Sequence, residues 1–184
     1  MEFGNPVKLA NGQYFLKIKT PNLQVNKVTL SSDLTSGEAN IKLPEKILTA
    51  VSSLDAQILR QAITSKMEWF QKSLEDNVIE GAYQGSVSDG VLTAGLAKVK
   101  GAVVTQAYDT SKQIVPLADV KSGATVDVLV ELAGLWFLKK NFGPVWRIVQ
   151  VRVSAQAKPK FPTEYLFGDD AEEEQADDPA DYMD

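Results

Sequence analysis

The chain has 184 residues, 44% hydrophobic and 23% charged, with a net charge of −5, which suits one globular domain with or without a tail. It contains neither cysteine nor histidine, which excludes disulfides, zinc sites built from these residues, and catalysis by a histidine base. No apolar run reaches the roughly 18–20 residues that span a bilayer, and a signal-peptide pattern is lacking, so we expect an intracellular protein without membrane contacts.

The first predicted element is a strand over residues 13–19, where polar and apolar residues alternate with a period of two. Its one face carries Tyr14, Leu16 and Ile18, and its other face carries Phe15, Lys17 and Lys19. A second strand is expected over 23–30 and a short extended piece over 39–43.

Residues 44–75 read as a helical insert, because apolar residues recur there every three or four positions. We expect Pro44 at the first helical position and a break near Ser52–Ser53, with Ser53 capping the second part. Trp69 is expected to pack this insert against the rest of the fold, with a nucleic-acid contact as the alternative.

The remaining chain predicts mainly strands: an irregular connection over 76–90, a strand pair over 91–100 and 102–108, and a loop over 112–124. A long strand follows over 125–138, in which Gly134 indicates a bulge or a sharp bend. In the last strand, 145–153, Val149, Val151 and Val153 are expected to face away from Trp146 and Ile148. Strands on either side of one helical insert favour an α+β chain, mainly β, built around a small β-barrel.

Aromatic and basic residues are densest over residues 134–152, GLWFLKKNFGPVWRIVQVR. Such a surface suits single-stranded nucleic acid, because bases stack on aromatic rings and cations follow the phosphates without reading base identity. The candidate binding residues in this segment are Trp136, Phe137, Lys139, Lys140, Phe142, Trp146, Arg147 and Arg152. Candidates outside it are Phe15, Lys17, Lys19, Lys98 and Lys100.

Several of these residues have an alternative role, since an aromatic residue in a barrel strand usually belongs to the core. For Trp136 and Trp146 both interpretations stay open. Phe142 lies in the predicted turn 141–144 and is expected to be exposed. Arg147 falls in register with the valines, so it is expected at the barrel rim or paired with Glu131.

The chain after Gly168 is strongly acidic: it holds nine Asp and Glu residues and no Lys or Arg, which leaves 15 acidic and 19 basic residues, a net charge of +4, in the rest. We expect a disordered tail that mimics a phosphate backbone and occupies the basic groove until DNA displaces it. Tyr182 and Met183 would give a partner protein an apolar foothold. The tail residues assigned to this role are Asp169, Asp170, Glu172, Glu173, Glu174, Asp177, Asp178, Asp181 and Tyr182.

The chain resembles the virus-encoded single-stranded DNA-binding proteins of large nucleocytoplasmic DNA viruses, which are related to the replication binding protein of short-tailed coliphages. The resemblance rests on residues 126–153, VDVLVELAGLWFLKKNFGPVWRIVQVRV, and on the terminal DDAEEEQADDPADYMD. It implies an OB fold, roles in DNA replication and recombination, and a tail that competes with DNA and contacts DNA polymerase and helicase or primase. It also implies a possible homodimer and a location at the site of viral DNA replication. One departure is the ending Tyr182-Met183-Asp184, where the coliphage protein ends in an aromatic residue.

We therefore expect an OB-like domain over 1–160, an acidic tail over 161–184, and sequence-independent binding of single-stranded DNA without a cofactor. The alternative is an acidic-tailed protein-interaction or chaperone-like module that binds basic partners. An enzyme is not expected, because no catalytic motif is present, and Asp127 and Glu131 would lie roughly 13 Å apart on a strand, too far for one metal.

Overall fold

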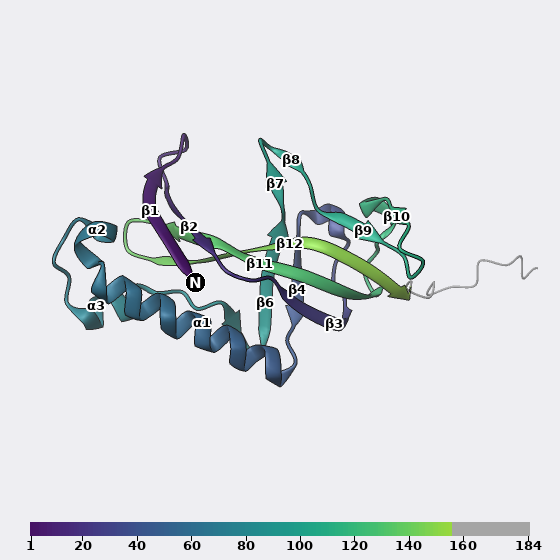
Figure 1. Cartoon of the computed structure of the whole chain (residues 1–184), viewed down its shortest axis with the longest axis horizontal. Coiled ribbons are helices and arrows are strands. Elements are labelled where there is room, and N and C mark those ends of the chain that lie inside the picture. Colours follow the sequence, from purple (N-terminus) through teal and green to yellow (C-terminus); the bar gives the residue numbers. More distant parts are fainter. Residues whose placement is uncertain (156–184) are drawn as a thin grey trace, which may run out of the picture.

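Two long antiparallel strands, β11 (Thr125–Phe137) and β12 (Phe142–Ala155), organise the computed structural model of the chain, which describes residues 1–155 (Figure 1). They meet at a tight turn, in which the Leu138 N–H donates to the Asn141 carbonyl at 2.8 Å. The predicted long strand and its hairpin partner are therefore confirmed, with the turn two to three residues earlier than expected.

The other strands pair along both edges of this hairpin in the order β1-β2-β11-β12-β6-β4. Strand β2 pairs with the C-terminal half of β11, and β3 pairs with its N-terminal half. β6 and β9 both run parallel to β12. The curved sheet forms an OB-like β-barrel, mainly β, with a helical insertion, as the sequence predicts. The larger flanking strands are β1 (Glu2–Lys8), β2 (Tyr14–Lys19), β3 (Leu23–Thr29), β4 (Glu38–Lys42) and β6 (Val91–Leu96).

Short elements complete the barrel between β6 and β11. The predicted strand pair over 91–100 and 102–108 is correct only next to its turn at Gly101, where β7 pairs with β8, because β6 and β9 pair with other strands. The β7–β8 hairpin extends beyond the sheet at the top of Figure 1, as does the turn that joins β1 to β2. The short elements are η1 (Leu34–Ser36), β5 (Val87–Ser88), β7 (Lys98–Val99), β8 (Ala102–Val103), β9 (Gln106–Tyr108), β10 (Ile114–Val115) and η2 (Leu117–Asp119).

The barrel core is made by the inward side chains of these strands. Along β11 burial alternates from residue to residue as far as Leu132, because Val126, Val128, Val130 and Leu132 are all buried. Leu16 and Ile18 of β2 are buried as well, whereas Tyr14, which the sequence placed on the same face, is largely exposed at the end of the strand.

Two irregularities decide which side chains face inward on the hairpin. The pairing shifts between Leu132 and Gly134, so Gly134 marks a bulge as predicted. It shifts again where Leu129 opposes Gln150 and Val130 opposes Ile148, which leaves Val149 as an extra residue. Because this bulge reverses the alternation, Ile148, Val151 and Val153 share the buried face, and the expected separation of Ile148 from the valines is wrong.

The helical insert consists of α1 (Glu45–Thr64), α2 (Lys66–Phe70) and α3 (Asp76–Ala82). The predicted break near Ser52–Ser53 is wrong: both serines are exposed within a continuous α1, which is held by the burial of Val51, Ile58 and Ala62. The break comes at Ser65, and α3 occupies part of the segment that was predicted as an irregular connection. In the described chain, no helix has the length and apolar character needed to cross a membrane.

Candidate nucleic-acid interface

The face of the sheet that points away from the core carries the candidate site, and we call it the outer face. Opposed residues of β11 and β12 form its centre, and β2 extends it on one side. The outer face consists of Phe15 and Lys17 on β2, Asp127, Leu129, Glu131, Gly134 and Trp136 on β11, and Gly143, Val145, Arg147, Gln150 and Arg152 on β12.

Two half-buried aromatic rings lie on glycines of this face. Phe15 and Trp136 are direct cross-strand neighbours. A Cβ atom at Gly134 would lie 2.5 Å from Cζ of Phe15, and one at Gly143 would lie 3.1 Å from Cζ2 of Trp136, so each ring rests where a side chain is missing. The absence of a side chain at these glycines lets the rings lie low on the sheet, with part of each ring open to solvent. We call this pair the aromatic platform.

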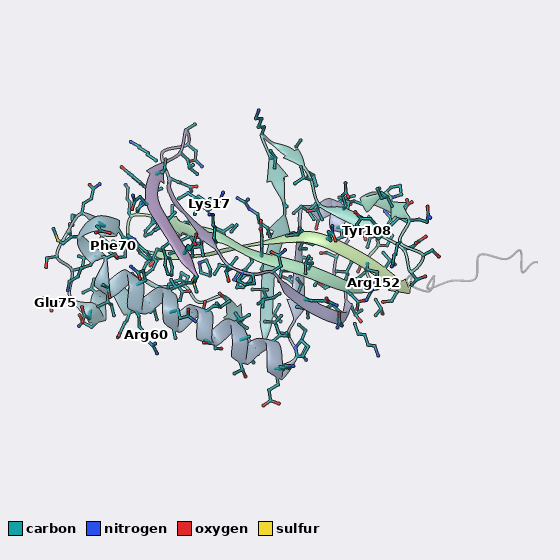
Figure 2. All side chains as sticks on the ribbon, viewed as in Figure 1. Lys17, Arg60, Phe70, Glu75, Tyr108 and Arg152 are labelled. Atoms are coloured by element: carbon teal, nitrogen blue, oxygen red, sulfur yellow. The ribbon has the colours of Figure 1, made fainter. Side chains whose placement is uncertain are left out.

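The cations predicted for this face differ in how they are engaged. Lys17 is exposed opposite Gly134, beside the aromatic platform, and Figure 2 shows it near the middle of the molecule. Lys19 lies 3.4 Å from Glu2, both largely exposed, and such surface pairs contribute little. Arg147 directly opposes Glu131, the partner that the sequence offered as one alternative.

Arg152 and Asp127 form the most defined ion pair of the face, joined through Nε at 2.9 Å and through Nη2. Asp127 also accepts the backbone N–H of Lys27 at 2.9 Å. Burial acts to raise the pKa of the Asp127 carboxyl, but the Lys27 N–H and the Arg152 guanidinium outweigh it and hold that pKa below its usual value. The carboxylate is therefore ionised at neutral pH and neutralises Arg152.

Three aromatic residues predicted to bind nucleic acid lie on the inner face instead. Phe137, Phe142 and Trp146 are only 9%, 1% and 4% exposed, so the expectation of an exposed Phe142 is wrong, and these rings offer no surface on which a base could stack. Phe137 and Phe142 stack on each other at 5.7 Å, and Phe70 of α2 meets both edge-on. Their role is to join the hairpin to the helical insert. Trp69 joins them as expected, 6.2 Å from Phe137.

Trp146 is held by a polar network between the barrel and α1. Its Nε1–H donates to Oγ of Ser86 at 2.9 Å, and both Ser86 and the Tyr83 hydroxyl donate to the carboxylate of Asp55. Burial, and next the charge of Asp55, raises the pKa of Tyr83 far above its usual value, so the hydroxyl remains a proton donor. This network gives the buried indole of Trp146 a structural role, which accounts for the residue without a contact to nucleic acid.

The remaining predicted lysines lie away from the aromatic platform. Lys139 and Lys140 are exposed in the turn of the hairpin, next to α2 and α3, and Lys98 and Lys100 are exposed on the β7–β8 hairpin. The structure thus brings Phe15, Lys17 and Trp136 together, with Arg147 and Arg152 further along the same face. The acidic residues of the tail, with Tyr182, lie outside the described residues.

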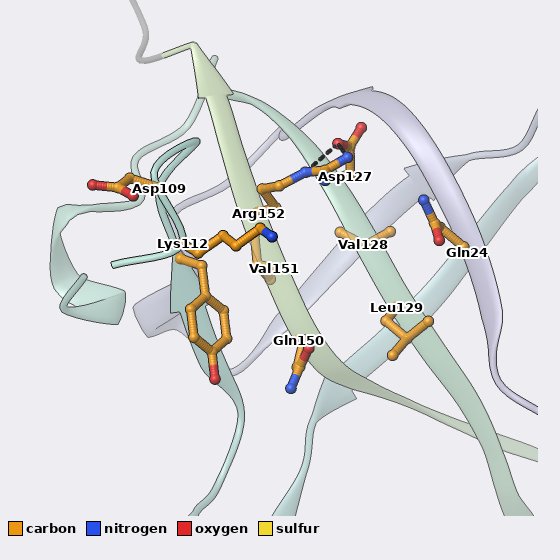
Figure 3. A pocket seen from close by; sticks show the side chains of 10 residues that line it. Gln24, Asp109, Lys112, Asp127, Val128, Leu129, Gln150, Val151 and Arg152 are labelled. Atoms are coloured by element: carbon orange, nitrogen blue, oxygen red, sulfur yellow. Dashed lines mark hydrogen bonds and ion pairs between the residues drawn. The ribbon is translucent and has the colours of Figure 1, made fainter. Parts of the chain in front are cut away.

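Sequence reasoning missed a hollow at the far end of the outer face (Figure 3). It encloses about 350 Å³ and is lined by Gln24, Tyr108, Lys112, Leu129 and Gln150, together with the Arg152–Asp127 pair. We call it the Tyr108 hollow. Tyr108 and Lys112 lie in segments without a strong pattern, and only the parallel pairing of β9 with β12 brings them here.

Comparison with known proteins gives a family and a shared fold. The model of a family of unknown function (DUF5871) matches residues 26–169. No curated protein sequence matches the chain. Two solved structures of the single-stranded DNA-binding protein from bacteriophage Enc34 share the fold, each with a TM-score of 0.50. The structure in complex with ssDNA is 11% identical and covers 85% of this chain and 98% of its own. The other is 12% identical and covers 90% and 96%.

Proposed function

We propose that this chain, which belongs to the family of unknown function DUF5871, binds single-stranded DNA on the outer face of its barrel without regard to sequence. The observation that carries the proposal is the aromatic platform: Phe15 and Trp136 lie side by side on two paired strands, with the exposed Lys17 next to them. Rings offer stacking surfaces to bases, and the cations attract phosphates.

The fold supports the same conclusion. The bacteriophage Enc34 protein is a single-stranded DNA-binding protein whose structure is known in complex with ssDNA, and it shares the fold of this chain over nearly its whole length. OB-type barrels commonly bind single strands in this way, over about 4–16 nucleotides. A virus-encoded role in replication and recombination, at the site of viral DNA replication, belongs to the proposal.

We assign the acidic segment a regulatory role within this function. Residues 1–160 would form the binding domain, and 161–184 would form a tail whose acidic residues, nine of them after Gly168, compete with DNA for the cations and recruit DNA polymerase and helicase or primase. Strand β12 ends at Ala155, three residues after Arg152, so the described part of the chain stops at the edge of the outer face. Covalent attachment of the tail raises its local concentration there.

Titration with oligo-dT, followed by tryptophan fluorescence, tests the proposal. We expect tight binding, a much weaker affinity for duplex of the same length, and a fall in log K against log salt with a slope of about −0.7 for each phosphate contact. Equal affinity for duplex and single strand, or no binding, would overturn it.

Removing residues 168–184 separates this function from the alternative, an acidic protein-interaction module. The DNA-binding proposal expects the shortened chain to bind oligo-dT more tightly. Unchanged DNA binding, together with lost binding to a basic protein such as a histone, would favour the alternative.

A further inference from the structure

We infer that the Tyr108 hollow holds one nucleobase of the bound strand, stacked on Tyr108 and read at its edge by the amides of Gln24 and Gln150. The inference rests on the proposed function and refines it: binding is independent of sequence along the strand except at this one position, which prefers one type of base. The hollow lies on the outer face, at the opposite end of β11 and β12 from the aromatic platform.

Position connects the hollow to the platform. Along β11 the outer face runs from Trp136 to Leu129, about 23 Å at about 3.3 Å per residue. Figure 2 shows Lys17 near the middle of the molecule and Tyr108 and Arg152 near the end where β12 stops. A strand that stacks on the platform and follows Arg147 along β12 arrives at the hollow.

Charge favours a base over a phosphate as the occupant. The hollow is lined by two negatively charged side chains, Asp109 and Asp127, and by two positively charged ones, Lys112 and Arg152. Their net charge is zero. Arg152 is held by Asp127, and Asp109 accepts the backbone N–H groups of its own turn from Ser111 and Gln113. A lining without net charge attracts a phosphate or another anion poorly, whereas a nucleobase is neutral and needs no positive charge to bind.

The ring of Tyr108 is fixed for stacking. Its hydroxyl donates to Oε1 of Gln106 at 2.6 Å, and the residue pairs with Arg152 of β12 in the sheet. The side chain is half-buried, so part of it remains open to the hollow, where Leu129 provides apolar contact. Figure 3 labels Leu129 and Gln150 among the side chains that line the hollow.

Two amides supply hydrogen bonds to the edge of a base. Nε2 of Gln24 donates to Oδ1 of Asn26 at 2.7 Å, which fixes the orientation of this amide and leaves its oxygen and one N–H available. The amide of Gln150, within the described residues, makes no hydrogen bond and is exposed at the hollow. Amides carry a donor beside an acceptor, the combination that matches the edge of a base in an unpaired strand.

The stacking role is tested with the full chain, by anisotropy of labelled oligo-dT and of an abasic backbone of equal length. We expect Tyr108→Ala to lower the affinity for oligo-dT about tenfold and that for the abasic backbone less than about twofold. Gln113→Leu, on the same exposed loop but outside the hollow, serves as the matched control and should leave both affinities unchanged. Unchanged oligo-dT binding by Tyr108→Ala would overturn the inference.

The edge role is tested with oligo-dT against oligo-dC, whose bases exchange a donor for an acceptor. The native chain should discriminate between them at least about fivefold, and the double variant Gln24→Leu/Gln150→Leu should reduce that ratio below about twofold. A native ratio of one overturns the inference and leaves the proposed function standing. Failure of the native chain to bind either oligonucleotide overturns the proposed function itself.

Discussion

Trp136 and Trp146 lie ten residues apart in one hairpin and face opposite sides of the sheet. Trp136 lies half-buried over Gly143 on the outer face, and Trp146 is buried and bonded to Ser86. Their contrasting surroundings make the two indoles a matched pair for assigning the DNA-binding face.

We expect Trp136→Ala to lower the affinity for oligo-dT about tenfold, because one base loses its stacking partner. Trp146→Phe keeps a buried ring but loses the hydrogen bond to Ser86, so it should lower the free energy of unfolding by about 1 kcal/mol and leave DNA affinity within about twofold. Anisotropy titration and urea denaturation of both variants provide the measurements. The reverse pattern, with Trp146→Phe losing affinity and Trp136→Ala keeping it, would contradict DNA binding on the outer face.

Asp127 contributes stability that depends on pH. Its pKa is lowered in the folded chain, so its contribution is complete above the unfolded value of about 3.9 and is lost as the pH falls through the lower folded value. We expect Asp127→Asn to lower the free energy of unfolding by about 1–2 kcal/mol at pH 7, since Arg152 and the Lys27 N–H lose a charged acceptor. Below pH 3 the difference should shrink, which urea denaturation at both pH values will show.

At the residue scale the sequence correctly predicted that aromatic and basic residues form the site, but it was less successful in predicting which of them do. The alternation of residues 13–19 correctly placed Phe15 and Lys17 together on the face opposite Leu16. The prediction of an exposed Phe142 was wrong, because this residue lies not in a turn but at the start of β12, where its ring stacks on Phe137. The packing of the helical insert decides which rings of this aromatic segment are buried. The local sequence pattern does not indicate where that insert packs.

At the scale of elements, one unpredicted bulge explains why the two faces of β12 differ from the prediction. The extra residue at Val149 reverses the faces of β12, and a period-two pattern read straight through it assigns half the strand to the wrong side. Gly134 indicates its bulge in the sequence because glycine is rare in strand interiors. Val149 is a favourable strand residue, so the sequence gives no sign of the bulge there. The uninterrupted α1 has a different cause, since burial of its apolar stripe outweighs the two serines.

Gly134 offers a test of this element-level reading. A Cβ there would collide with the backbone carbonyl of Leu16 and with the ring of Phe15, and the backbone cannot move aside without disturbing the pairing of β2 with β11. We expect Gly134→Ala to lower the free energy of unfolding by about 1–3 kcal/mol, and to weaken DNA binding by displacing Phe15.

Gly81 is the matched control for this substitution. It lies in α3, has no atom within 4 Å of a built Cβ, and has an ordinary φ, so Gly81→Ala should raise the free energy of unfolding by up to about 1 kcal/mol. Urea denaturation compares the two. Equal stability of both variants would show that Phe15 does not rest against Gly134.

For the whole molecule, the relevant property is the separation of charge along the chain. Up to Phe167 the sequence carries a net charge of +4, and the segment after it carries nine carboxylates and no cation. In Figure 1, β12 stops at the opposite end of the molecule from α2 and α3, beside β9 and β10. The described part of the chain thus ends where the outer face holds Arg152 and the Tyr108 hollow, away from the aromatic cluster of the helical insert.

This arrangement predicts how the effect of the tail depends on salt. If the carboxylates of the tail bind the cations of the outer face, DNA must displace them. This competition weakens at high salt, because ions screen the attraction between the charges. Deleting residues 168–184 should therefore raise the affinity for oligo-dT about tenfold at about 0.05 M salt and less than about twofold at about 1 M, where the screening length falls to about 3 Å. Paired salt titrations of the full and shortened chains measure this difference. A gain in affinity that stays constant across the salt range would point to steric obstruction by the tail and not to competition for charge.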